Sequence, residues 1–385
     1  MCASTPASLV LLGFAAIFGT PYFTTQAADQ SHQQKNAPLA SLVQSSNDII
    51  ETVIAPATAR NKRNSEGDII VLKDGTILAA WSDFYGGSGD FAAARISAAK
   101  STDGGRTWGH RYTLQENVGQ QNVMSVSFLR SHSGDILFFY LVKNSRRDLD
   151  CVLRRSSDAA RTWSEPVLIT PEPGYYVMNN ARVIQLKSGR ILCPMSFTEE
   201  VWTRSEAFHT VTYFSDDDGR TWQRGKGIVR CPKRGAMEPG LVELKDGRVL
   251  QIIRTQLGQI WHTHSADGGD TWTEASPWAV AAPEAPSTLT RTADHGDLLL
   301  IYNPTVNLDV DHAGARTPLV AVVSTDEGKS WSKPKSIESD LDATYAYTSV
   351  TFLRDRALIT YYVAPKGTDR LALKFKSIPL RWFRE

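Results

Sequence analysis

Ionisable and polar side chains recur at one position of a repeated pattern in this sequence. The pattern is a Leu-Lys/Arg step after an apolar stretch, with threonine replacing leucine once, and its anchors are Leu72, Leu129, Leu186, Leu244, Thr290 and Leu353. Six residues before these anchors stand Glu66, Val123, Asn180, Glu238, Glu284 and Tyr347. Five of these six residues are polar or ionisable and head a strand that then turns apolar. Acidic groups gathered in such a ring are typical of a functional site.

The expected direction of the strands adds further candidates to this ring. Each first strand runs away from the ring, the second returns to it and the third leaves again. Arg254 ends the second strand of the fourth unit, and Arg316 begins the third strand of the fifth. Asp90 lies in a Gly-rich loop before the third strand of the first unit, and Arg63, with Arg60 in reserve, precedes its first strand. We therefore expect three basic residues, at least two acids and a tyrosine at one mouth.

A second repeat, the octet S-x-D-x-G-x-T-W, indicates how the candidates are positioned. Its five copies are STDGGRTW at 101, SSDAARTW at 156, SDDDGRTW at 215, SADGGDTW at 265 and STDEGKSW at 324. Aspartate can accept backbone N–H bonds in a tight turn, glycine can adopt the left-handed conformation, and tryptophan can cover an apolar edge. We interpret the octet as an outer structural turn, in which Ala160 would replace glycine in the left-handed region.

The two repeats together predict an all-β fold. Six hairpin-like units recur at intervals of roughly 50–60 residues, and helical periodicity is absent after about residue 60. Such units predict a six-bladed β-propeller over residues 47–385, with five octet turns. The sixth unit lacks an octet, and a strand near residues 49–53 is expected to complete it and close the ring.

The chain resembles the exo-α-sialidases, or neuraminidases, over roughly residues 60–363. These enzymes are six-bladed propellers whose repeated turns are called Asp boxes. The resemblance implies that Asp90 is the acid/base and Tyr347 the nucleophile, assisted by Glu238. It also implies that Arg63, Arg254 and Arg316 surround the carboxylate of the substrate. Hydrolysis of terminal α-linked sialic acid with retention, without a metal or organic cofactor, is the function that the resemblance implies.

One part of the sequence departs from the family pattern. The family has Arg-Ile-Pro before the first strand, whereas this chain has KRNSEGDIIVL, which places Arg63 about two residues early. Glu66 is not expected in the family's site, and we include it among the candidate substrate-binding residues. Asn180 and Glu284 either line the pocket or make structural hydrogen bonds. Two alternatives stay open: a glycosidase for another acidic sugar, such as another nonulosonic acid or a uronate glycan, or a non-catalytic glycan-binding propeller.

Composition limits the other classes of function. The net charge of +1 gives no electrostatic reason to expect nucleic acid or an anionic membrane surface as a partner. Residues 8–19 form an apolar run too short to span a bilayer, and they predict a signal peptide over residues 1–28. Export to the periplasm or the medium follows from this prediction, and residues 29–46 are expected to be a flexible lead-in. Cys151, Cys193 and Cys231 form neither a disulfide framework nor a zinc pattern.

Overall fold

The protein is almost entirely β-structure in the part that the computed structural model describes, residues 48–204 and 206–385. Its only helical segments there are two short 3-10 turns, η2 (Asp311–Ala313) and η3 (Leu380–Phe383). The predicted all-β fold is confirmed. No helix in this part of the chain is long and apolar enough to cross a membrane. The predicted signal peptide (1–28) and lead-in (29–46) lie outside the described residues.

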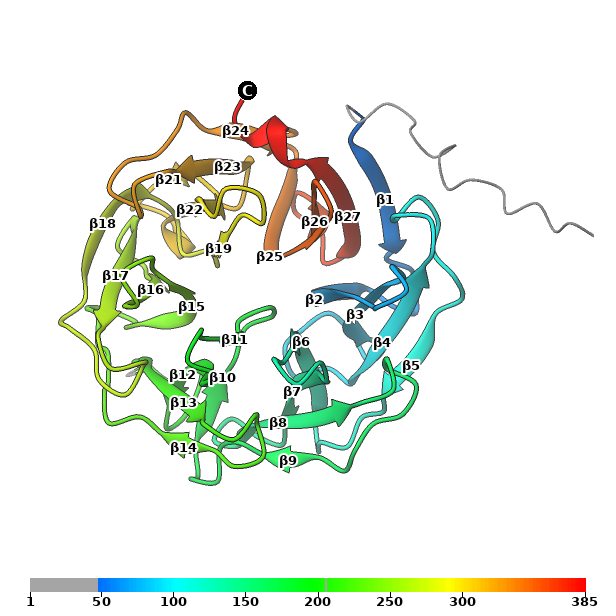
Figure 1. Cartoon of the computed structure of the whole chain (residues 1–385), viewed down its shortest axis with the longest axis horizontal. Helices are drawn as coiled ribbons and strands as arrows, with labels where there is room; N and C mark the ends of the chain where they lie inside the picture. The colour runs from blue at the N-terminus through cyan, green and yellow to red at the C-terminus, as the bar shows by residue number, and fades with distance from the viewer. Residues whose placement is uncertain (1–47, 205) are drawn as a thin grey trace, which may run out of the picture. The chain divides into compact units, whose positions relative to one another are not determined.

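Across these residues, small antiparallel sheets are arranged as blades around a central axis (Figure 1). The first blade contains β2 (Arg63–Val71), β3 (Ile77–Phe84), β4 (Ala94–Ser101) and β5 (Tyr112–Gln115). The second contains β6 (Asn122–Arg130), β7 (Ile136–Lys143), β8 (Leu149–Ser156) and β9 (Val167–Leu168). The third contains β10 (Tyr175–Val177), β11 (Ile184–Gln185), β12 (Ile191–Thr198), β13 (His209–Ser215) and β14 (Gln223–Arg224).

The remaining three blades follow in chain order. The fourth contains β15 (Met237–Glu243), β16 (Val249–Arg254), β17 (Gln259–Ser265) and β18 (Ser276–Ala281). The fifth contains β19 (Thr288–Arg291), β20 (Leu298–Tyr302), β23 (Leu319–Ser324) and β24 (Lys335–Glu338), with a hairpin of β21 (Thr305–Val306) and β22 (Gly314–Ala315). The sixth contains β25 (Ala343–Leu353), β26 (Arg356–Pro365), β27 (Ala372–Pro379) and β1 (Ile50–Ala55). One parallel contact joins β8 to β10, so the second and third blades share hydrogen bonds but remain separate units, and the six-bladed prediction is confirmed.

The ring closes where the first and last strands of the described chain meet. β1 pairs antiparallel with β27 as the outer strand of the sixth blade, as predicted for residues 49–53. Trp108 of the first octet strengthens this closure, because its indole N–H donates to the Thr52 hydroxyl at 3.0 Å. The same ring packs edge-on against Phe375 of β27, with ring centroids 5.3 Å apart. The octet tryptophan therefore bridges the first and sixth blades.

The five octets form one repeated turn. In the first copy, the N–H and hydroxyl of Thr107 donate to the Asp103 carboxylate at 2.9 and 2.6 Å, and the Gly105 N–H donates to the Ser101 hydroxyl. The same hydroxyl-to-aspartate bond recurs in the other copies, at Asp158, Asp217, Asp267 and Asp326. Ala160 has φ 62° at the glycine position, as predicted, which costs on the order of 1 kcal/mol.

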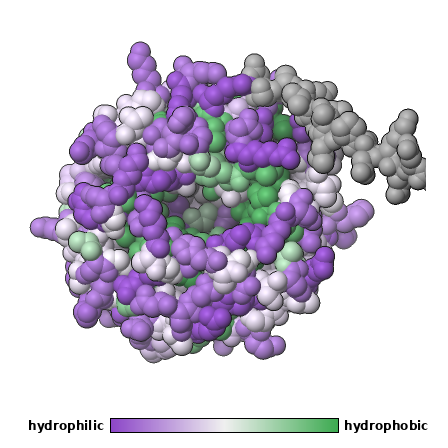
Figure 2. Space-filling view, in the orientation of Figure 1, coloured by the Kyte–Doolittle hydropathy of each residue, from purple (hydrophilic) through white to green (hydrophobic). Residues whose placement is uncertain are grey.

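The apolar core lies between neighbouring blades. Leu78 and Ala80 of the first blade pack with Phe128 and Phe138 of the second, and all four side chains are buried. The same arrangement recurs between the fourth and fifth blades. Figure 2 shows that the face turned toward the viewer is hollowed at its centre and ringed by hydrophilic residues. The packed blades therefore form a frame that holds the heads of the inner strands in place.

A bulge occurs near the head of several inner strands, and it turns a side chain toward the axis. The strand register shifts at Glu66 in β2, at Glu238 in β15 and at Tyr347 in β25. These residues have φ values of 46°, 41° and 58°, in the left-handed region that side chains rarely adopt. Such strain is often found at functional sites, where the surrounding structure enforces it.

Candidate active site

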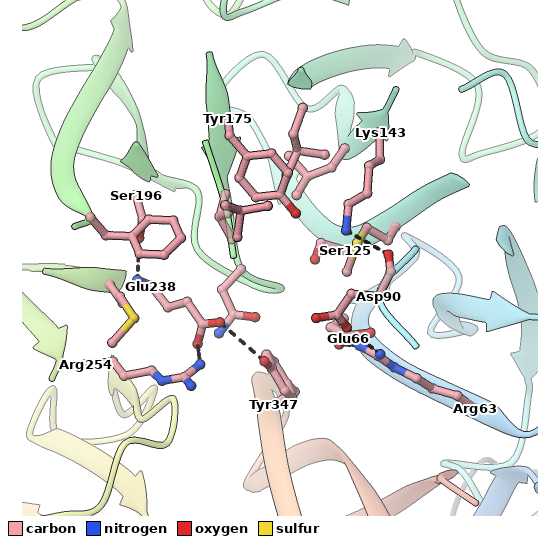
Figure 3. Close-up of a pocket in the computed structure, with 18 of the residues that line it drawn as sticks. Arg63, Glu66, Asp90, Ser125, Lys143, Tyr175, Ser196, Glu238, Arg254 and Tyr347 are labelled. Atoms are coloured by element: carbon pink, nitrogen blue, oxygen red, sulfur yellow. Dashed lines mark hydrogen bonds and ion pairs between the residues drawn. The ribbon is translucent and has the colours of Figure 1, made fainter. Parts of the chain in front are cut away.

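A cavity of about 480 Å³ at the heads of the inner strands contains most of the predicted site residues (Figure 3). They come from the first, fourth, fifth and sixth blades. The predicted residues that line it are Arg63, Glu66, Asp90, Glu238, Arg254, Arg316 and Tyr347. Counting back from the anchors therefore identified groups that are far apart in the sequence and close together in space.

Tyr347 and Glu238 face each other across the axis. The phenol of Tyr347 donates a hydrogen bond to Glu238 Oε1 at 3.3 Å. The Glu238 backbone is fixed because its N–H donates to the Ser196 hydroxyl at 2.5 Å. Burial raises the pKa of the Tyr347 phenol above its usual range and the Glu238 carboxylate adds to this effect, whereas Arg254 and Arg316 oppose it. The phenol is therefore neutral, and the Glu238 carboxylate accepts its hydrogen bond.

Arg254 connects this pair to a buried acidic group behind the pocket. Its Nη1 lies 2.8 Å from Glu238 Oε2, and its Nη2 lies 3.8 Å from Glu284 Oε1. Glu284 is fully buried and also accepts hydrogen bonds from Arg234 and His312, each at 2.8 Å. Burial would raise the pKa of Glu284, but His312, Arg254 and Arg234 outweigh it and lower the pKa to about 2. A permanent negative charge thus holds Arg254 in place.

Of the three predicted arginines, Arg316 has the fewest charged partners among the described residues. Its guanidinium lies 5.7 Å from the centre of the Tyr347 ring. Its one hydrogen bond given by the described residues runs from Nη1 to the Tyr362 hydroxyl, at 3.1 Å. No carboxylate of the described chain is within ion-pair distance of it. Most of its N–H donors are therefore free to bind an anion.

Arg63 has a different environment, because protein groups already occupy its donors. Its Nη2 pairs with the Glu66 carboxylate, and its Nε donates to the Ser65 hydroxyl at 2.9 Å. Its Nη1 donates to Asp90 Oδ1 at 2.6 Å and to the Ser88 carbonyl at 3.1 Å. Since the Glu66 side chain is only 2% exposed, the pair it forms with Arg63 is buried. The bulge in β2 therefore places an acid, Glu66, beside Arg63.

Asp90 and Lys143 form the opposite rim of the pocket. The Asp90 side chain is 47% exposed, but its backbone carbonyl is held by the Lys143 ammonium at 2.8 Å and by the Asn122 amide at 2.9 Å. Burial would raise the pKa of the Asp90 carboxyl, but Arg63 and Lys143 outweigh it and lower the pKa to about 2. Burial also lowers the pKa of Lys143 to about 8, against the charge of Asp90. Asp90 is thus ionised while its backbone is fixed.

Three predicted residues lie outside the cavity lining. Asn180 is fully buried, and its amide donates to the carbonyls of Gly67 and Tyr347. These contacts fit the alternative that Asn180 makes structural hydrogen bonds. Glu284 supports Arg254 from behind, and Arg60, the reserve for the first arginine, is exposed away from the pocket.

The sequence reasoning missed several residues that line the cavity. Lys143 ends the second strand of the second unit, the same position that identified Arg254 in the fourth, so one rule applied to every unit would have found it. No repeat position identifies Tyr175 at the start of β10, His312 in η2, Tyr362 inside β26, or Trp202 and Arg234, which lie between strands.

Comparisons with known proteins agree with this architecture. Residues 51–359 match the model of a family described as "BNR repeat-like domain". Four curated sialidases are 22–28% identical to the chain, which spans 51–62% of their lengths. The sialidase of Micromonospora viridifaciens is 25% identical over 351 residues, or 82% of this chain and 51% of the relative.

Solved structures share the fold at lower identity. A Dyadobacter fermentans protein of unknown function superposes with a TM-score of 0.69 at 20% identity, covering 86% of this chain and 99% of its own. The Trypanosoma rangeli sialidase, in complex with 2,3-difluorosialic acid as a covalent intermediate, superposes with a TM-score of 0.67 at 18% identity, covering 86% of this chain and 58% of its own. The chain belongs to the BNR repeat-like domain family.

Proposed function

We propose that this protein is an exo-glycosidase that removes terminal α-linked sialic acid from glycoconjugates with retention of configuration. The observation that carries the proposal is the Tyr347 phenol, 3.3 Å from Glu238 Oε1, in a cavity that Arg254 and Arg316 also line. A sugar acid has a carboxylate that guanidinium groups can bind through charge-assisted hydrogen bonds. The same carboxylate would repel an attacking Asp or Glu, whereas a neutral phenol avoids that repulsion.

In the first step, the bond between the anomeric carbon and the glycosidic oxygen breaks. Asp90 in its acid form gives a proton to the leaving oxygen, the Tyr347 oxygen bonds to the anomeric carbon, and the phenolic proton passes to Glu238. In the second step, Asp90 takes a proton from water while the water oxygen attacks the same carbon. Tyr347 leaves and recovers its proton from Glu238, so one water is added and the configuration is retained.

Asp90 can act as an acid only if its pKa rises when substrate binds. In the free protein, Arg63 and Lys143 keep the carboxyl ionised. We infer that the substrate carboxylate draws Arg63 away from Asp90 and places a second negative charge beside it. Both changes raise the pKa of Asp90, so substrate binding itself would supply the catalytic proton.

One observation favours a second candidate substrate. Glu66 occupies Arg63 and adds a carboxylate to the pocket, so fewer donors remain for a sialic acid carboxylate. A different acidic sugar, such as another nonulosonic acid or a uronate at the end of a glycan, is therefore the runner-up.

Export, directed by a signal peptide with its apolar run at residues 8–19, also remains part of the proposal, and N-terminal sequencing of the mature protein would test it.

The test compares the wild type with Tyr347→Phe, Asp90→Ala and Arg316→Ala on an aryl α-sialoside and on a panel of other acidic aryl glycosides. Hydrolysis of the sialoside by the wild type, and a loss in all three variants, would support the proposal. Turnover confined to another acidic glycoside would favour the runner-up. Binding of acidic glycans with no turnover of any substrate would favour a non-catalytic propeller.

A further inference from the structure

An exposed tryptophan stands at the mouth of the cavity, on the segment between β12 and β13. Trp202 lines the cavity, yet it is 49% exposed. Its φ is 64°, a left-handed conformation that favours glycine and is strained for other residues. A large apolar side chain held in a strained backbone beside an active site indicates a binding role more than a structural one.

The backbone on both sides of Trp202 is tied to the protein. Val201 is buried, and its N–H donates to the Arg146 carbonyl at 3.0 Å. The Trp202 N–H donates to the Glu206 carboxylate, which in turn pairs with Arg234 at 2.6 Å. Arg234 is also bonded to Glu284, the group behind Arg254. The indole is therefore presented from a fixed backbone that is connected to the pocket wall.

Trp202 lies beside the loop that carries the proposed acid. Its ring centroid is 4.8 Å from that of Phe91 at an interplanar angle of 60°, and Phe91 directly follows Asp90. The Lys143 ammonium lies 4.7 Å from the centre of the same Phe91 ring and also holds the Asp90 carbonyl. This pair of aromatic rings therefore lies next to the residue proposed to protonate the leaving oxygen.

We propose that Trp202 forms a subsite for the sugar on the leaving side of the scissile bond, which stacks a pyranose ring against the exposed indole. This inference rests on the proposed function, because the role of Asp90 defines the leaving side. The exposed Arg146 guanidinium lies 5.6 Å from the centre of the indole ring, where it can donate hydrogen bonds to the hydroxyls of that sugar. The enzyme thus prefers a glycan over a small alkyl group as the leaving partner.

The experiment measures kcat/KM on two sialosides that differ only in the leaving group, sialyllactose and methyl α-sialoside. Trp202→Ala is expected to lower kcat/KM for sialyllactose about tenfold, the size of one lost stacking contact, and to leave the methyl sialoside nearly unchanged. Trp202→Phe, which keeps an aromatic ring, is expected to restore much of the loss. Arg146→Ala is expected to produce a smaller loss, again only with sialyllactose.

Tyr112→Ala serves as the matched control, because Tyr112 is an exposed aromatic residue that does not line the cavity. Equal effects of Trp202→Ala on the two sialosides, or no effect on either, would overturn the subsite while leaving the proposed function intact. A wild-type protein that hydrolyses neither sialoside would overturn the proposed function and the subsite together.

Discussion

The two sides of the pocket hold similar charged groups but differ in how completely protein partners occupy the arginine N–H donors. The tyrosine side, made of Glu238, Arg254, Arg316 and Tyr347, leaves donors unused: Arg316 has a single hydroxyl partner, and Arg254 Nε has none among the described residues. The aspartate side, made of Arg63, Glu66, Asp90 and Lys143, is an almost closed set of ion pairs and hydrogen bonds. On the proposed mechanism, the tyrosine side would bind the anion, whereas the aspartate side would hold the proposed proton donor in a charged resting state.

The largest expected effect is on the tyrosine side. Tyr347→Phe removes the nucleophilic oxygen and keeps the ring, so we expect kcat on an aryl sialoside to fall about a thousandfold or more. Tyr362→Phe is the control, because it removes only the hydroxyl that Arg316 contacts. Steady-state kinetics on both variants would decide the matter, and similar losses in the two would contradict a special role for Tyr347.

The next prediction compares Arg316, which has no ion-pair partner among the described residues, with Arg63, which has two. Arg316→Ala should weaken binding of an unsaturated sialic acid analogue about a hundredfold, because it removes a charge with free donors. Arg63→Lys keeps the charge and should weaken binding less. Titration calorimetry would measure both, and a larger loss in Arg63→Lys would reverse the assignment of the two sides.

The free energy of unfolding should depend more on Arg63 than on Arg316. Arg63→Met leaves Glu66 buried without its ionic partner, so we expect the free energy of unfolding to fall by about 3 kcal/mol. The double variant Arg63→Met with Glu66→Gln should recover part of this loss, because it removes the buried carboxylate that the single variant leaves unpaired. Urea unfolding followed by tryptophan fluorescence tests this, and a double variant no more stable than the single one would show that the Arg63–Glu66 ion pair is not the cause.

The smallest expected effect is the uptake of one proton when an anion binds. Asp90 has a pKa of about 2 in the free protein, so at pH 5 it is ionised. If anion binding raises that pKa, binding takes up a proton between the free and bound pKa values, and affinity falls as pH rises through the bound value. Calorimetry with the unsaturated analogue in two buffers of different ionisation enthalpy would detect the uptake. It should vanish in Asp90→Asn and persist in Asp369→Asn, a control at the same cavity; uptake by Asp90→Asn would assign the proton to another group.

Much of the fold could be predicted because its determinants are local and repeated. Each octet contains the side chains that satisfy its own turn, Ser101, Asp103 and Thr107 in the first copy, and each hairpin has an alternating pattern. Counting from the anchors also identified Glu238 and Tyr347, because equivalent strand heads meet at the axis of a propeller. Repetition thus provided a register without any second sequence.

The rest depends on contacts that no repeat encodes. The pairing of Arg63 with Glu66 depends on a bulge in β2, whereas the sequence shows only that Arg63 lies about two residues earlier than the family pattern places it. Glu284 is at a predicted position, yet its contacts with Arg234 and with His312 of η2 come from parts of the chain that the repeat does not specify. Trp202 lies in a loop segment between strands, where neither periodicity nor spacing indicates a neighbour.

Because β1 pairs with β27, the sixth blade contains strands from near both ends of the described chain, and the end of β27 lies beside the start of β1. A gene rearranged so that residue 379 continues through a short linker into residue 50, with new termini at the exposed tip of an octet, would keep every strand pair. Such a circularly permuted protein should keep its pocket, whereas deletion of residues 50–55 would expose the edge of β27 and allow the ring to open from that blade.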